Sequence, residues 1–131
     1  MEYTYEFEQG PFDLVVRLTG AADVGAIMAR RVEVLSDERV RPGMNVLYDL
    51  SGLDSTGIGT SEVRTLANDS RRFEPHGFNC VAIVAPKPLI YGLMRMFTAY
   101  SDGVQHSEQL VIVETEAEAY AWLESVTAGA E

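Results

Sequence analysis

The sequence has few residues of the kinds that form disulfide cross-links or bind metals. It holds one cysteine, Cys80, among 131 residues, so no disulfide can form within the chain. Its two histidines, His76 and His106, have no Cys or His neighbour at metal-ligand spacing. We therefore expect no metal and no cofactor. Cys80 precedes an apolar run, and we expect it to be an inert thiol in a buried strand.

Basic residues are scarce as well. Ten Lys and Arg residues, of which only Lys87 is lysine, stand against 20 Asp and Glu, which gives a formal net charge of −10. This charge repels nucleic-acid phosphates and anionic lipid surfaces, so we expect no nucleic-acid partner. No apolar run reaches the length of a membrane span, so we expect no stable membrane insertion. The acidic, alternating N-terminus is unlike a signal peptide, and we expect a cytoplasmic protein.

Common catalytic signatures are missing. The sequence has no Gly-x-Ser-x-Gly nucleophile elbow and no phosphate-binding glycine loop with a lysine. Gly57 and Gly59 lack the third glycine of a dinucleotide-binding fingerprint. Asp49 and Asp54 could form a catalytic carboxylate pair, but an aspartate at the end of a strand more often anchors a loop. We therefore predict that the protein is not an enzyme.

What the sequence does contain is a regular alternation of strand and helix patterns. Alternating or continuous apolar runs predict strands over 2–8, 12–18, 44–50, 78–85 and 110–113. Helical spacing predicts helices over 24–35, 63–73, 89–101 and 115–123. Strands that are joined by helices pair in parallel through crossovers. We therefore predict a single α/β domain over 1–131, with a mixed, mostly parallel five-stranded sheet, an antiparallel N-terminal edge strand and four helices.

Two helix starts carry capping signals, and one loop stands out. Asp23 is placed to cap the first helix, and Thr115 with Glu118 has the capping-box spacing. Residues 51–60 are rich in Ser, Thr and Gly and are expected to form a loop at the carboxyl end of a central strand. Ligand and signalling sites in such sheets gather at this edge.

The hydroxyls of this loop allow two interpretations. Unpaired backbone N–H groups and the helix dipole favour an anion at the start of the next helix. A phosphate on Ser55 or Thr56 would meet those donors or change the charge of the loop. Plain helix capping accounts for the same hydroxyls. Lys87, between two prolines, could bind an anion near Ser55 if the two loops are neighbours.

The loop also carries a family resemblance. The strand-loop-helix segment that includes residues 46–52, followed by Asp54-Ser55-Thr56-Gly57-Ile58-Gly59, resembles STAS domains, which include anti-sigma-factor antagonists and the wider SpoIIAA-like group. The family motif is of the type Asp-Ser-Ser-Gly-Leu-Gly. Its first serine, the phosphorylation site, matches Ser55, and Thr56 replaces the second serine. This sequence has a shorter segment between Asp49 and Asp54 than the family's usual loop.

The resemblance implies a fold and a function. Segments 81–84, 91–97 and 119–123 also resemble uncharacterised bacterial STAS-like proteins, whose fold is related to a family of lipid carriers. The implied architecture is the SpoIIAA-like (βα)n domain. The implied function is a non-catalytic regulatory domain that binds another protein, such as a kinase or an anti-sigma-like regulator. The implied recognition loop comprises Asp49, Asp54, Ser55, Thr56 and Gly57.

The segment 89–101 is apolar nearly all round, which is typical of a helix buried on more than one side. It could add to the core, form a homodimer face or line a pocket for an apolar or lipid-like ligand. In the last two cases the residues would include Tyr91, Met94, Arg95 and Met96, where methionines adapt to a ligand. Such a carrier is the alternative to the regulatory function. Gly92, in mid-helix, predicts the close approach of another element.

Overall fold

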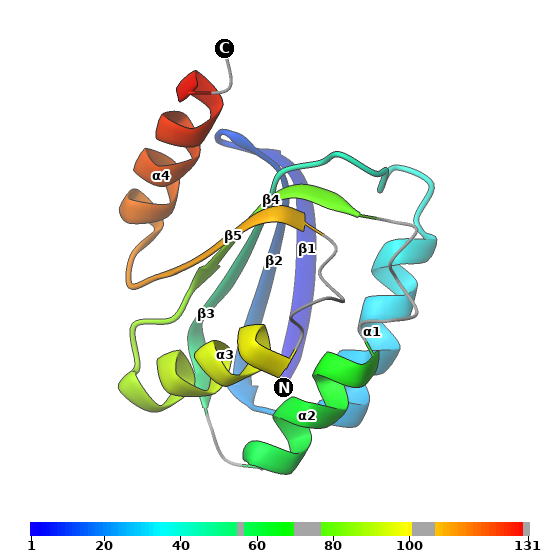
Figure 1. Cartoon of the computed structure of the whole chain (residues 1–131). Coiled ribbons are helices and arrows are strands. Elements are labelled where there is room, and N and C mark those ends of the chain that lie inside the picture. Colours follow the sequence, from blue (N-terminus) through cyan, green and yellow to red (C-terminus); the bar gives the residue numbers. More distant parts are fainter. Residues whose placement is uncertain (55–56, 70–76, 101–106, 130–131) are drawn as a thin grey trace.

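The computed structural model describes residues 1–54, 57–69, 77–100 and 107–129, in which strands and helices alternate (Figure 1). The elements are β1 (Glu2–Gln9), β2 (Phe12–Ala21), α1 (Val24–Ser36), β3 (Val46–Asp54), α2 (Thr60–Asp69), β4 (Phe78–Val84), α3 (Pro88–Tyr100), β5 (Ser107–Val113) and α4 (Glu116–Gly129). No helix in these ranges has the length and apolar character needed to cross a membrane.

The five strands form one sheet in the order β1-β2-β3-β4-β5. β1 runs antiparallel to β2, and the other neighbouring pairs are parallel. The short turn between β1 and β2 contains Gly10, whose φ of +63° suits a residue without a Cβ. This mixed sheet with its antiparallel edge strand and four helices confirms the predicted fold class.

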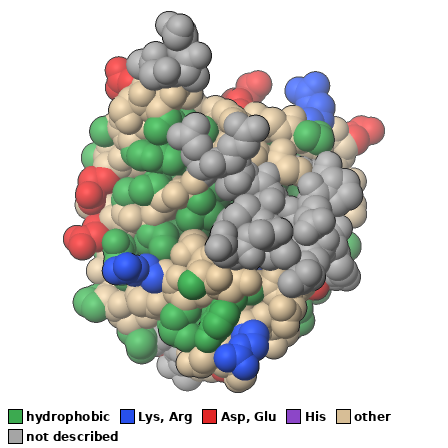
Figure 2. All heavy atoms as spheres, in the orientation of Figure 1, with side chains coloured by type: hydrophobic (Ala, Val, Ile, Leu, Met, Phe, Trp, Pro, Cys, Tyr) green, Lys and Arg blue, Asp and Glu red, His purple; other side chains and the backbone are tan. Residues whose placement is uncertain are grey.

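Helices cover both faces of the sheet (Figure 1). Side chains alternate along a strand, so Leu14 and Val16 of β2 face the core beneath α1, α2 and α3. Val15 faces the opposite side, where Ala119 and Leu123 of α4 pack against the sheet. Burial on both faces explains the continuous apolar runs of β3 and β4. In the same orientation, acidic side chains lie at the outer edge of α4, basic ones lie over α2 and α3, and hydrophobic ones spread over both regions (Figure 2).

Two of the expected helix caps are present. The Ala26 N–H donates to Asp23 Oδ1 at 3.1 Å, so Asp23 caps α1. The Glu118 N–H donates to Thr115 Oγ1 at 3.1 Å, and the Thr115 hydroxyl donates to Glu118 Oε1 at 3.2 Å. The two bonds that Ala26 and Glu118 donate satisfy N–H groups that the start of a helix leaves without an intrahelical partner.

β3 is longer than the sequence predicts. The prediction of a loop over 51–60 is wrong for 51–54, which continue the strand. The register moves from Arg17 opposite Asp49 to Thr19 opposite Gly52, so β3 carries one extra residue there and stays paired with β2. α2 begins at Thr60, the last residue of the predicted loop, and the predicted helix residues 70–73 lie outside the described residues.

The expected close approach at Gly92 is also wrong. A Cβ at Gly92 would have no atom within 4 Å, whereas a Cβ at Gly52 would lie 2.8 Å from Thr19 Cγ2. Glycine at position 92 therefore destabilises the helix relative to alanine, and no close packing within the monomer offsets this effect.

These two glycines give the first prediction. Gly92→Ala should stabilise the protein by about 1 kcal/mol, because alanine restricts the unfolded chain and meets open space in the folded one. Gly52→Ala should destabilise it, and Thr19→Ser should relieve part of that loss by removing the methyl group. Urea unfolding followed by circular dichroism measures both changes. A destabilised Gly92→Ala variant would contradict the open environment of this position.

Candidate functional site

The carboxyl ends of the parallel strands bring the loop after β3 beside the connection before α3. The Lys87 ammonium donates to the Leu53 carbonyl oxygen at 2.9 Å. The Ala22 N–H donates to the Asp54 carbonyl oxygen at 3.0 Å, which ties the end of β3 to the residue after β2. The end of β3 and the connection before α3 are therefore neighbours, and Lys87, the only lysine in the sequence, lies between them.

The loop is anchored on both sides of residues 55–56. Leu53 is 2% exposed and Ile58 is 8% exposed, and both pack in the core beneath α1, α2 and α3. Gly57 has a φ of +85°, and a Cβ there would lie 3.0 Å from the Ala22 carbonyl oxygen. Ser55 and Thr56, the candidate phosphoacceptors, lie outside the described residues.

The start of α2 already holds a carboxylate. Glu62 Oε1 accepts the Gly59 N–H at 2.7 Å, and Glu62 Oε2 accepts the Ser61 hydroxyl at 2.6 Å. These two bonds hold the pKa of Glu62 below its usual range, and the bond from the Ser61 hydroxyl has the larger effect. An anion that reaches this helix end must therefore compete with Glu62 for the Gly59 N–H or bind Lys87 instead.

The sequence-based prediction misses the role of Glu62, because it assigns no cap and no first residue to this helix. With Gly59 as the residue before the helix, Glu62 occupies the third helical position, where a glutamate reaches back to the cap. This three-residue spacing is the signal that could have located both the helix start and the cap.

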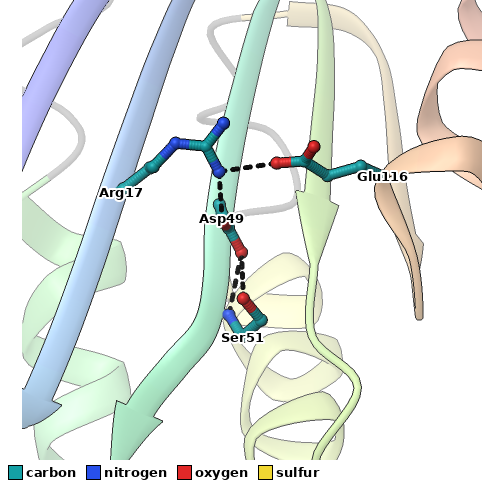
Figure 3. Close-up of polar contacts among 4 residues, drawn as sticks. All are labelled: Arg17, Asp49, Ser51 and Glu116. Atoms are coloured by element: carbon teal, nitrogen blue, oxygen red, sulfur yellow. Dashed lines mark hydrogen bonds and ion pairs between the residues drawn. The ribbon is translucent and has the colours of Figure 1, made fainter.

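Asp49 belongs to a different cluster, on the face of the sheet that α4 covers (Figure 3). It accepts hydrogen bonds from the Arg17 guanidinium and, at 2.6 Å, from the Ser51 hydroxyl. The Ser51 N–H donates to the same carboxylate at 3.0 Å. Arg17 also donates to Glu116 Oε1 at 2.6 Å, so one guanidinium joins β2, β3 and the first turn of α4.

This cluster keeps Asp49 ionised. Burial raises the pKa of Asp49, but the bonds from Ser51 and Arg17 lower it by more, so its pKa lies below the usual range. A carboxylate with such a low proton affinity is a weak general base at neutral pH. The geometry therefore gives Asp49 a structural role, whereas Asp54 stands next to the loop.

The structure does not bring the four named residues of α3 together on one surface. Met94 is 8% exposed and lies in the main core, and Tyr91 and Met96 are partly buried against that core. Arg95 is exposed. A groove of about 290 Å³ lies instead on the α4 side, lined by Pro11, Asn45, Tyr120, Leu123, Glu124 and Thr127.

No group of three or more His, Cys, Asp or Glu side chains in the described part of the chain could hold a metal ion. His76 and His106 fall outside that part. Comparison with protein-family models, curated proteins and solved structures finds no match for this chain. A function for this protein must therefore be inferred from the residues around the end of β3, Lys87 and the start of α2.

The Gly57 geometry gives a prediction with a matched control. Gly43 has a φ of +88°, close to that of Gly57, but nothing lies within 4 Å of its Cβ position. Gly43→Ala should cost about 1 kcal/mol, the strain of a left-handed backbone. Gly57→Ala should cost more, because its methyl group also meets a backbone carbonyl. Equal losses in urea unfolding would show that Ala22 does not constrain the loop.

Asp49 gives a prediction on pH. Its lowered pKa contributes stability that is present above the unfolded value of about 3.9 and is lost as pH falls through the folded value. The stability difference between wild type and Asp49→Asn should therefore be constant near neutral pH and shrink below about pH 4. Urea unfolding from pH 7 to pH 3 measures it. Parallel curves over the whole range would contradict the ion-paired state of Asp49.

Proposed function

We propose that the chain is a non-catalytic, STAS-like regulatory domain that recognises another protein through residues 54–60, with Ser55 as the phosphoacceptor. The order of strands and helices agrees with what the resemblance implies for such a domain. The observation that carries the proposal is the Lys87 contact, because it provides a cation for the loop in a chain that is otherwise acidic.

The chemistry of Lys87 suits a phosphoryl group. Its ammonium has three N–H donors, and the Leu53 carbonyl takes one of them. Leu53 is two residues before Ser55 in the sequence, so a group attached at position 55 would be joined to the chain close to the carbonyl that Lys87 binds. A phosphoserine brings nearly two negative charges and strong acceptor oxygens. Lys87 would attract this group, which would favour the modified form of the loop.

The start of α2 supplies the opposing contribution. Glu62 occupies the Gly59 N–H, and Asp54 adds a second negative charge beside the loop. A phosphate would repel both carboxylates and compete for the Gly59 N–H. Phosphorylation would thus exchange one set of hydrogen bonds for another at the surface that the partner recognises. This is an electrostatic switch of the kind that regulates protein interactions.

The carrier of an apolar or lipid-like ligand is the weaker proposal. Met94 contributes its side chain to the core, so α3 has less apolar surface for a ligand than the sequence suggests. A carrier would use the groove beside Tyr120 and Leu123 instead. In a homodimer of the regulatory domain, α3 would form the interface, and a second copy would then occupy its exposed face.

Phosphoserine incorporated genetically at position 55 tests the role of Lys87. The neighbouring ammonium should hold the second phosphate pKa, about 6 in a free peptide, below the value that the carboxylates of Asp54 and Glu62 alone would give. Lys87→Gln should raise it again, and a ³¹P NMR titration measures both values. Phosphoserine at position 36, at the end of α1, is the control and should not respond to Lys87→Gln. An unchanged pKa at position 55 in the Lys87→Gln variant would refute the proposed contact.

A further inference from the structure

The basic groups of this acidic protein are unevenly distributed. Residues 75–101 contain no Asp or Glu, although the chain has 20 of them. Lys87 and Arg95 lie in this stretch. Arg64 of α2 joins them, because its guanidinium carbon lies 5.1 Å from the centroid of the Tyr100 ring. Its Nη2 also donates to the Tyr100 hydroxyl at 3.4 Å.

Ion pairs distinguish these three cations from four of the other arginines in the described part of the chain. Four other arginines form ion pairs with carboxylates: Arg17, Arg30, Arg31 and Arg39. Within the described ranges, Arg64, Lys87 and Arg95 have no such pair. Their positive charge is therefore available to a partner, and it stands out against the net charge of −10.

Apolar surface accompanies this charge. Leu89 is 62% exposed and Tyr100 is 39% exposed. Leu89, Gly92, Arg95 and Ala99 are all exposed, and their spacing of three or four residues places them on one face of α3. Space above Gly92 is open to at least 4 Å. Figure 2 shows basic and hydrophobic side chains together over α2 and α3, whereas the α4 side carries hydrophobic side chains with acidic ones at its outer edge.

We propose that this α3 face, comprising Leu89, Gly92, Arg95, Ala99, Tyr100 and Arg64, docks an acidic amphipathic helix of another protein. Carboxylates on the partner would pair with Arg64 and Arg95, and its apolar side chains would cover Leu89 and Tyr100. The small residues Gly92 and Ala99 leave room for a helix backbone to approach closely.

The charge of the protein also favours an acidic protein partner over an anionic membrane. Membrane-binding segments commonly concentrate four to eight Lys or Arg residues, as a rough rule. This face has two arginines with Lys87 nearby, on a protein whose net charge opposes membrane contact. The proposal deepens the proposed function by naming the chemistry of the partner. The docking proposal rests on the proposed function in one respect, namely that the partner is a protein. It does not require a phosphate on Ser55.

A pair of synthetic peptides tests the proposal against the ¹⁵N-labelled full chain. One peptide is a helix with a leucine seam flanked by glutamates, and its control has glutamine at every glutamate position. The acidic peptide should shift the NMR signals of residues 88–100 and Arg64. Arg95→Glu should weaken its binding by about tenfold or more, as should replacement of its glutamates by glutamine. Arg41→Glu makes the same charge change in the connection between α1 and β3, and should alter the affinity by less than about twofold.

Four results would overturn the proposal. The acidic peptide could shift no signals or only signals elsewhere, or the glutamine peptide could bind equally well. Phosphatidylserine vesicles could bind the chain where the acidic peptide does not. Sedimentation could reveal a dimer that Arg95→Glu dissociates, which would make a second copy the occupant. None of these results changes the ³¹P titration of phosphoserine 55, so failure here and failure of the proposed function are distinguishable.

Discussion

Burial of β3 on both faces is the constraint on which the rest of the structure depends. Val46 and Leu47 are consecutive, point to opposite faces and are both 0% exposed. Such a strand needs helices on each side, which α1 to α3 provide on one face and α4 on the other. β3 thereby delivers the loop at 54–60 to the carboxyl edge of the sheet, where ligand and signalling sites gather in α/β domains.

Much of the fold could be predicted because its signals are local. The alternation of strand and helix patterns indicated a mixed sheet, and the spacing of Thr115 and Glu118 indicated the start of α4. The extension of β3 through Ser51 to Asp54 was missed, because it depends on pairing with β2 rather than on composition. Ser and Gly favour a loop locally, but the neighbouring strand overrides that preference.

The candidate site was predictable only in part for the same reason. The motif around Ser55 and the position of Lys87 could be read from the sequence, but their adjacency depends on how β3 and β4 align. Arg17, Asp49 and Glu116 come from three distant segments, and no local pattern links them. The exposed face of α3 was likewise hidden within a segment that is apolar nearly throughout.

In the proposed regulatory domain, the loop at 54–60 and the α3 face would serve one partner. Lys87 connects them, because it precedes α3 and donates to the end of β3. A partner that covers both would experience a change of charge in the loop while it remains attached to the helix. This arrangement separates affinity, which the α3 face would supply, from regulation, which the loop would supply.

Native mass spectrometry of the protein purified gently from its own host tests the central claim most directly. We predict a phosphorylated form, with the phosphate located at Ser55 or Thr56 by fragmentation. In the Ser55→Ala variant this phosphate should be lost or should move to Thr56. A chain without phosphate under all growth conditions, carrying a non-covalent hydrophobic molecule, would contradict the regulatory function and support the carrier.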